Sequence, residues 1–268
     1  MLRQILSVIL IAFLACSLVT AGNSRLNTNL SEKLIGNISL NSKEVVIGVA
    51  FSPDGSRLAY TTKDADGMWA VNLDGRSGSK FDGIDFPRFS PDGRHFAYAA
   101  KSGAEWFMVL DGKKGPGYYR LSGLTFSQDS NRSAYAATSN NRTFMVIDGR
   151  DEGLKVDNIT SFMFSPKGDR YAYIGVQEDT QFVIADGIKG PDYDKINLIE
   201  FSSDGSHLAY LVTDEFFKKK FVVLDGQKGK DYDRVVVIKG RLFEPEGDFH
   251  YVGIRGNEAY LIRADLSP

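Results

Sequence analysis

Cysteine is nearly absent from this sequence: among its 268 residues there is one, Cys16. A single cysteine cannot form a disulfide within the chain, so packing alone must stabilise the fold. An excess of one charge sign is also lacking, since 32 lysines and arginines nearly balance 34 aspartates and glutamates. That balance gives no strong field, so we expect no nucleic-acid partner and no electrostatic attraction to an anionic membrane.

Long hydrophobic runs are missing except near the N-terminus, where Ile5–Leu14 follows the positive charge of Arg3. This run is too short to span a bilayer comfortably, and with its flanks it has the layout of an export signal. We therefore expect the mature protein to be periplasmic or secreted. An uncleaved anchor helix is the alternative interpretation of the same residues.

Two processing sites compete at the end of this run. The tripeptide "VTA" before Gly22 fits an ordinary signal-peptidase cut, which makes residues 1–21 the signal peptide. The stretch "AFLAC" resembles instead the bacterial lipoprotein signal, which makes residues 1–15 the signal and Cys16 the acylated lipid anchor of a membrane-anchored lipoprotein. In either case residues 22–37 are predicted to be a tether, because they are polar and without a clear pattern.

What the sequence has in abundance is one motif, first met as "FSPDGSRLAY" at Phe51. Variants of it follow as "FSPDGRHFAY" (Phe89), "FSQDSNRSAY" (Phe126), "FSPKGDRYAY" (Phe164), "FSSDGSHLAY" (Phe201) and, one residue shorter, "FEPEGDFHY" (Phe243). Steps of 38, 37, 38, 37 and 42 residues separate these phenylalanines. Self-similarity at a period of about forty residues is the signature of a repeat architecture.

Two further signals accompany each copy. An aspartate, in a "DG" dipeptide or its degenerate form, ends an apolar run at Asp74, Asp111, Asp148, Asp186, Asp225 and Asp265. Five residues before each motif phenylalanine stands an aliphatic residue, namely Val46, Ile84, Leu121, Ile159, Ile196 or Ile238. We predict that these aliphatic residues belong to a separate strand, the fourth of each unit.

The motif itself predicts a tight turn between two strands. In Ser52–Gly55 the proline stands second, where its fixed φ is correct, and the glycine takes a left-handed φ. Asp54 then accepts backbone N–H bonds within the turn and does no chemistry. Lys167 replaces this aspartate in the fourth copy while Pro166 and Gly168 remain, which argues against a calcium-binding role shared by the copies.

Strands flank this turn, a third strand runs into each DG dipeptide, and the aliphatic segment supplies a fourth. Units of four short strands, repeated six times, predict an all-β fold: a six-bladed β-propeller of four-stranded antiparallel blades over residues 38–268. Helical repeats are excluded, because no unit has an uninterrupted run with helical periodicity that is free of glycine and proline turn signals.

The last unit ends after its third strand, which leaves the sixth blade without its outermost strand. Residues 38–47 carry Val46 in the repeat position and precede the first complete unit. We expect this N-terminal strand to complete the last blade, to close the ring and so to remove its open edges.

The pair of signals "FSPDG…LAY" and "…DG" resembles the repeat of the TolB-like β-propellers, a branch of the WD-like repeat proteins of bacterial envelopes. The resemblance covers about residues 38–266 and rests on five close copies and one degenerate copy. It implies that the repeat residues are scaffold, in a periplasmic binding or assembly protein or in the propeller domain of a serine peptidase. We expect neither the α/β domain that precedes the ring in TolB nor a hydrolase domain after the repeats.

Candidate catalytic and metal-binding residues are few. His95 and His207 stand where other copies have arginine, and His250 stands at a strand position, so the histidines have no ligand spacing. No G-x-S-x-G motif occurs, and Ser77 in a glycine-serine loop has no placed histidine. We therefore predict no metal site, no cofactor and no catalysis.

One face of the propeller is predicted to discriminate ligands. It carries the connections between second and third strands and between successive units, which vary most from copy to copy. The loop "FFKKK" (Phe216–Lys220) is an enlarged connection of this kind in the fifth unit. Its aromatic residues and lysines make either a contact surface or a merely mobile tip.

A second candidate site concerns the central channel. The residue before the motif phenylalanine is charged in two blades that stand opposite each other, as Arg88 and Glu200, and Arg241 lies nearby. We predict that these three residues form a ligand-binding site across the channel. A structural ion pair or a solvated channel lining is the alternative.

These observations favour an exported, non-catalytic propeller that binds a protein, peptide or glycan of the cell envelope on its variable face. We expect it to be a monomer. A propeller hydrolase or lyase with an active site at the channel mouth is the first alternative. An accessory propeller that gates a separate peptidase is the second.

Overall fold

The computed structural model describes residues 38, 40, 43–245, 247–264 and 266. The chain divides into two units, Met1–Leu34 and Ile35–Pro268. The first unit lies outside the described residues, and so do the predicted signal sequences, the tether and Cys16. In the described part of the chain no helix is long and apolar enough to cross a membrane.

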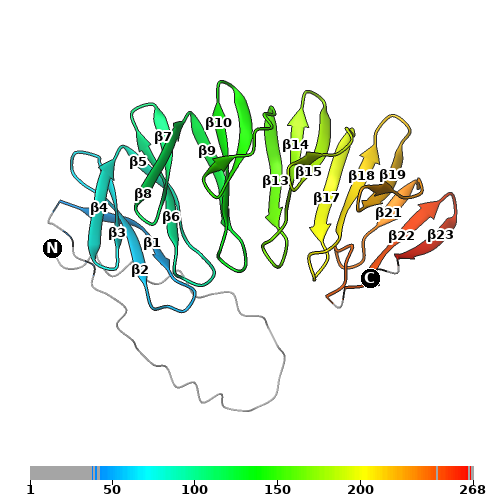
Figure 1. Ribbon diagram of the computed structural model, residues 1–268, viewed down its shortest axis with the longest axis horizontal. Helices are drawn as coiled ribbons and strands as arrows, with labels where there is room; N and C mark the ends of the chain where they lie inside the picture. The colour runs from blue at the N-terminus through cyan, green and yellow to red at the C-terminus, as the bar shows by residue number, and fades with distance from the viewer. Residues whose placement is uncertain (1–37, 39, 41–42, 246, 265, 267–268) are drawn as a thin grey trace, which may run out of the picture. The chain divides into compact units, whose positions relative to one another are not determined.

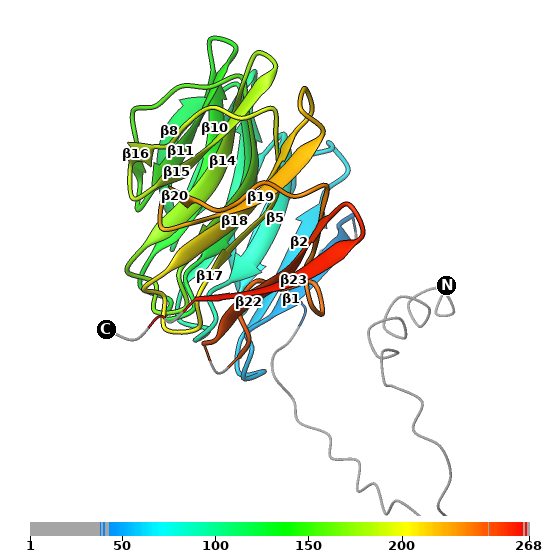
Figure 2. The same ribbon diagram turned by 90° about the vertical axis from the view of Figure 1, so that its right-hand side faces the viewer.

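Six antiparallel sheets make up the second unit, five with four strands and one with three. Figures 1 and 2 show the sheets following one another in chain order. Within every sheet the first strand pairs with the second, the second with the third and, where it is present, the third with the fourth. This is the architecture of a six-bladed β-propeller, as predicted, and we call the sheets blades one to six.

Each blade repeats the same strands. The first strands are β1 (Val45–Phe51), β5 (Gly83–Phe89), β9 (Arg120–Phe126), β13 (Asn158–Phe164), β17 (Lys195–Phe201) and β21 (Arg234–Val236). The second strands are β2 (Leu58–Lys63), β6 (Phe96–Ser102), β10 (Ser133–Ser139), β14 (Tyr171–Gln177), β18 (Leu208–Asp214) and β22 (Phe249–Arg255). The third strands are β3 (Trp69–Leu73), β7 (Glu105–Leu110), β11 (Arg142–Ile147), β15 (Thr180–Ala185), β19 (Lys219–Leu224) and β23 (Glu258–Ala264). The fourth strands are β4 (Arg76–Phe81), β8 (Lys113–Tyr118), β12 (Arg150–Asp151), β16 (Ile188–Lys189) and β20 (Gln227–Lys228).

In blades one to five the aliphatic repeat position lies on the first strand, and its prediction as a separate fourth strand is wrong. In blade one Val46 and Phe51 are both part of β1, and in blade two Ile84 and Phe89 are both part of β5. A register shift follows Val46 in the pairing of β1 with β2. Such a bulge breaks the simple alternation of the strand, which is why its continuity is hidden in the sequence.

The DG dipeptide turns the chain from the third strand into the true fourth strand. Asp74 and Gly75 have φ values of 50° and 79°, the conformation of a two-residue type I′ hairpin turn. The Asp74 carboxylate also accepts hydrogen bonds from Leu58 N at 3.1 Å and from Arg57 Nε at 2.9 Å. It therefore holds this hairpin to the start of the second strand. The same double contact is made by Asp111, Asp148, Asp186 and Asp225.

The motif turn is formed as predicted. Gly55 N donates to Ser52 O at 2.8 Å, and Gly55 has a φ of 67°. The Asp54 carboxylate accepts from Ser52 Oγ at 2.6 Å and from Ser56 N at 3.0 Å. These bonds, the one from the Ser52 hydroxyl first, lower the pKa of Asp54 to about 2. Asp54 is thus a turn residue.

The fourth copy keeps its turn although Lys167 replaces the aspartate. Asp169, two positions later, accepts from Ser165 Oγ at 2.7 Å and from Arg170 N at 3.0 Å. A carboxylate therefore still accepts the hydrogen bond of the motif serine, although it comes from a later position in the turn. The substitution is compensated within the turn itself.

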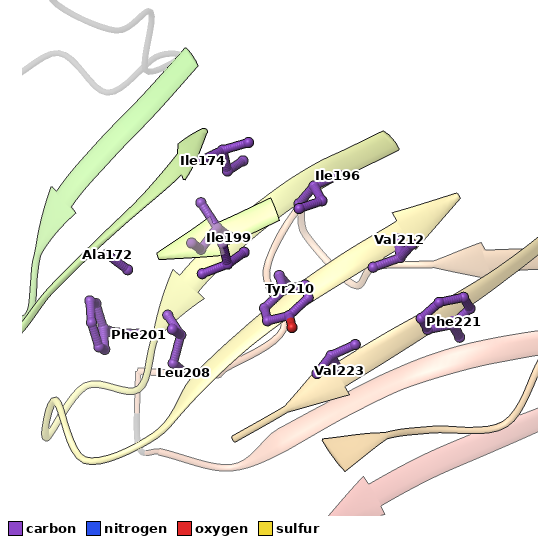
Figure 3. Packing of buried hydrophobic residues seen from close by; sticks show 11 residues of the cluster. Ala172, Ile174, Ile196, Ile199, Phe201, Leu208, Tyr210, Val212, Phe221 and Val223 are labelled. Carbon is purple, nitrogen blue, oxygen red and sulfur yellow. The ribbon is translucent and has the colours of Figure 1, made fainter. Parts of the chain in front are cut away.

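The hydrophobic core lies between the blades, in five clusters that each join two consecutive blades. Figure 3 shows the cluster of blades four and five, with side chains from β14, β17, β18 and β19 meeting between the sheets. The alanine that recurs on the second strands is 1% exposed or less at Ala59, Ala97, Ala134, Ala172 and Ala209. These positions lie in the inter-blade clusters, where a small side chain lets neighbouring sheets approach closely.

The end of the predicted closing segment, residues 38–47, differs from the prediction. We expected the segment to complete blade six, but Val45–Ile47 belong to β1, which pairs with β2 as the first strand of blade one. This strand carries the motif phenylalanine and the aliphatic position, which are the features of a first strand. Blade six has three strands in the described part of the chain, and residues 39, 41 and 42 of the predicted closing strand lie outside that part.

One side of β1 is consequently exposed. Phe51 is 53% and Val49 is 47% exposed, whereas the equivalent phenylalanines of blades five and six, Phe201 and Phe243, are 6% and 2% exposed. Those two are covered by the preceding blade. Among the described buried residues no cluster joins blade six to blade one.

Candidate functional site

A groove of about 410 Å³ lies where blade two meets blade three. It is lined by Asp85, Phe86, Lys101, Ala104, Trp106, Tyr119, Arg120, Leu121 and Ser122. These residues come from β5, from the β6–β7 hairpin, and from the β8–β9 connection with the start of β9. Both kinds of connection belong to the face that was predicted to discriminate ligands, and Figure 1 shows the β6–β7 hairpin at the end of its blade.

Phe86 is placed in this groove by an irregular backbone. Its φ is 54°, a left-handed conformation that is rare for a bulky side chain. The pairing of β5 with β6 shifts register between Asp85 and Arg88, so that Phe86 lies on a bulge. The Asp85 carboxylate accepts a hydrogen bond from Phe86 N at 2.9 Å and supports this conformation. Local strain of this kind is typical of ligand contacts.

The β6–β7 hairpin supplies the second wall. Gly103 N at its tip donates to Asp82 Oδ2 at 2.6 Å, and Asp82 N donates to Lys101 O at 2.9 Å. These bonds fix the hairpin to the start of blade two. Lys101 Nζ lies 6.0 Å from the centre of the Trp106 ring, at the outer limit of a cation–π contact. The wall therefore presents an aromatic ring beside a cation.

The third wall is the entry to blade three. Tyr119 is 72% exposed, and its backbone N donates to Thr138 O at 3.0 Å. Leu121, two residues later, is 5% exposed and belongs to the core cluster of blades two and three. The buried leucine thus anchors the segment, while Tyr119 and Arg120 are left at the groove.

The lining combines aromatic rings with an excess of positive charge. Phe86, Trp106 and Tyr119 offer apolar faces, and the last two also offer hydrogen-bond donors. Lys101 and Arg120 are cations, and the one lining carboxylate, Asp85, already accepts a backbone hydrogen bond. Such a groove suits a ligand that carries a ring or hydrocarbon face beside an anionic group.

The channel residues predicted as a ligand site have other partners. Arg88 Nη1 donates to Leu124 O at 2.8 Å, and the Glu200 carboxylate accepts from Leu242 N at 2.8 Å. Each side chain therefore ties its blade to the main chain of the next. Arg241 is exposed, and no ion pair joins it, Arg88 or Glu200 to another of the three in the described chain. Arg88 and Glu200 thus have structural contacts, and the predicted ligand-binding role of the three residues stays a prediction.

The remaining candidates fall into local pairs. His95 contacts Asp111, His207 contacts Asp225, and His250 contacts Glu244 at 3.4 Å, each pair within its own blade. Within the described ranges no group of three or more His, Cys, Asp or Glu side chains is close enough to hold a metal ion. The predicted lipid anchor, Cys16, lies outside those ranges.

Sequence reasoning identified the face of the groove but missed its residues. The signals were weak: Trp106 is one of two tryptophans, and Phe86 precedes a proline inside a strand, where a proline is unusual. Phe86, Trp106 and Tyr119 are brought together only by the packing of blade two on blade three.

Comparisons with known proteins support no family assignment. No protein-family model matches the chain, and no curated protein sequence matches it. Among solved structures, the chain is similar to the β-propeller domain of the Trilobed protease from Pyrococcus furiosus, with 13% identity over 85% of this chain and 83% of that chain and a TM-score of 0.44.

Two further similarities are to longer proteins. TolB from Acinetobacter baumannii is 16% identical over 82% of this chain and 60% of that chain, with a TM-score of 0.38. The acylaminoacyl peptidase of Pyrococcus horikoshii is 12% identical over 84% of this chain and 45% of that chain, with a TM-score of 0.40. Similarities at this level establish neither a family nor an activity for the chain, so the predicted TolB-like membership stays a prediction.

Proposed function

We propose that the protein is an exported, non-catalytic propeller that binds an acidic segment of a peptide or glycan in the groove between blades two and three. Its place of action is the cell envelope, to which the export signal predicted from Arg3 and Ile5–Leu14 directs it. The repeated blades are the scaffold, and the groove is lined by connections whose sequences differ from blade to blade.

The observation that carries this proposal is the position of Phe86. A bulky residue held at a φ of 54° costs conformational free energy, and its side chain remains 36% exposed. The left-handed φ belongs to the strand bulge, since Gly123 at the same repeat position of blade three has a φ of 67°. We attribute the presence of a ring at this position to contact with a ligand. Trp106, Tyr119 and Arg120 line the same groove and supply further stacking surfaces and a cation for a carboxylate.

The proposal is tested by screening the full chain against peptide and glycan pools in matched acidic and neutral forms. We expect retention of acidic members only, and a loss of about tenfold or more in affinity with Arg120→Gln or Tyr119→Ser, since each removes one contact to the ligand. Ile188→Ser is the matched control, because Ile188 is an apolar residue that is 75% exposed and lies in β16 of blade four, away from the groove. The proposal fails if neutral members bind equally well, or if Ile188→Ser weakens binding as much as the groove variants.

A further inference from the structure

The β18–β19 hairpin of blade five ends in an aromatic pair that the proposed function does not use. Phe216 and Phe217 are 82% and 67% exposed, and their ring centres lie 4.8 Å apart in an edge-to-face arrangement. Figure 1 shows this hairpin at the same end of the blades as the β6–β7 hairpin that borders the groove. Exposing two adjacent phenylalanines is unfavourable in water, so their retention at a tip calls for a partner.

The tip is held in place by its own hydrogen bonds. Phe217 N donates to Asp214 Oδ1 at 2.8 Å, and Glu215 N donates to Asp194 Oδ2 at 2.7 Å. Two of the nearby carboxylates are therefore engaged with the backbone of the hairpin. These hydrogen bonds fix the conformation of the turn that carries the two rings.

Lysines follow the aromatic pair directly. Lys218 is exposed, Lys219 pairs with Asp233 and is the first residue of β19, and Lys220 follows it in that strand. The acidic groups near the tip are Asp214, Glu215, Asp194 and Asp233, of which Asp214 is half-buried and the other three are exposed. The local charge is thus mixed, as it is over the whole chain, and long-range attraction to an anionic surface is not the driving force.

We propose that the Phe216–Phe217 tip inserts into the interfacial region of a lipid bilayer. Two rings on a convex turn, flanked on both sides by charged residues, provide too little apolar area for the core of a stable protein interface. The same two rings fit among lipid headgroups, where each ring is removed from water without needing a protein pocket of matching shape. The neighbouring Lys218 then lies at headgroup level, where a long cationic side chain reaches phosphate oxygens.

The test uses a fluorescent probe placed at the tip, so that membrane binding by the N-terminal segment does not produce the signal. The full chain carries Cys16→Ser, which removes the only native cysteine, and Glu215→Cys, which is labelled with a polarity-sensitive dye and keeps both rings. We expect a blue shift of the dye on mixing with phosphatidylethanolamine–phosphatidylglycerol vesicles. The shift should be lost with Phe216→Ser and Phe217→Ser together, and vesicle partitioning should fall by about tenfold or more, since two buried rings are removed.

Ile188→Cys, labelled in the same Cys16→Ser chain, is the control for adsorption of the whole surface, because Ile188 is also an exposed apolar residue. Its dye should not respond to the vesicles. An equal shift at both positions would overturn the proposal, and so would a shift at Glu215→Cys that survives the loss of both phenylalanines. A response to protein extracts but not to lipid would assign the tip to a protein partner and would also overturn it.

Discussion

Arg57 Nη1 donates a hydrogen bond of 2.9 Å to the main-chain carbonyl of Gly93, which lies in the motif turn of the next blade. The same guanidinium binds Asp74 through Nε and lies 5.3 Å from the centre of the Phe89 ring. One side chain therefore joins the DG hairpin of blade one to the turn and the core of blade two. Arg132 and Arg170 repeat this contact in blades three and four, with Gly168 O and Gly205 O as the acceptors.

Removing such an arginine should weaken the blade interface. We expect Arg57→Ala to lower the free energy of unfolding by about 1–2 kcal/mol, because bonds from a charged donor to another blade are lost. His95, at the same position of blade two, contacts Asp111 of its own blade. His95→Ala should therefore cost only about 0.5 kcal/mol. Urea unfolding measures both, and equal losses would contradict the account of the interface.

The turn of blade four provides a second comparison. Asp169→Ala should lower the thermal midpoint measurably, because Ser165 Oγ and Arg170 N lose their acceptor. Lys167→Ala, at the position where other copies have aspartate, should change stability by less than about 0.5 kcal/mol. Thermal unfolding of the two variants distinguishes them. A greater loss with Lys167→Ala would show that the compensating role of Asp169 is wrong.

Acid should destabilise the motif turns in a defined range of pH. The Asp54 pKa is lowered from 3.8 to about 2 by bonds from Ser52 and Ser56, and equivalent serine bonds lower the pKa values of Asp92, Asp129 and Asp204. A lowered folded pKa contributes stability that is present above 3.8 and is lost as the pH falls toward about 2. Urea midpoints measured across this range should fall with pH. Asp54→Asn should make the fall shallower, and an unchanged slope would argue against the turn role.

Equivalent phenylalanines should differ in what they contribute to stability. Phe201→Ala should cost about 3 kcal/mol or more, because the ring is buried between two blades. Phe51→Ala should cost less than about 1 kcal/mol, since Phe51 is 53% exposed. Chemical denaturation of both variants is the measurement. A large loss at Phe51 would show that its side of β1 is covered in solution.

The repeat made most of the fold predictable from the sequence. The motif turn follows from Ser52–Gly55 alone, because proline and glycine each select a backbone conformation that the turn requires. Blade number follows from counting the motif. The strand assignment failed at Val46, because a bulge between Val46 and Phe51 cannot be read from side-chain alternation. Placing Val46 on a separate strand also assigned the end of segment 38–47 to blade six, whereas Val45 and Val46 pair with β2 of blade one.

The site was less predictable, for a physical reason. Arg88 and Glu200 were predicted as site residues because they are charged at an apolar repeat position. A charged side chain at such a position can equally well bind the main chain of the next blade, as both residues do. Of the groove residues, Phe86 lies in β5, Trp106 lies in β7, and Tyr119 lies in the connection from β8 to β9. Their proximity depends on how the blades pack, which local sequence does not encode.

The central claim is that the groove binds the ligand, and tryptophan emission tests it most directly. Trp69→Phe leaves Trp106 as the only tryptophan, and Trp106→Phe leaves Trp69 of blade one as a matched reporter away from the groove. Titration with the acidic forms of the peptide and glycan pools should change the emission of the Trp69→Phe protein in a saturable way. It should leave the emission of the Trp106→Phe protein unchanged. No saturable change in either protein, or a change confined to the one that retains Trp69, would contradict the account.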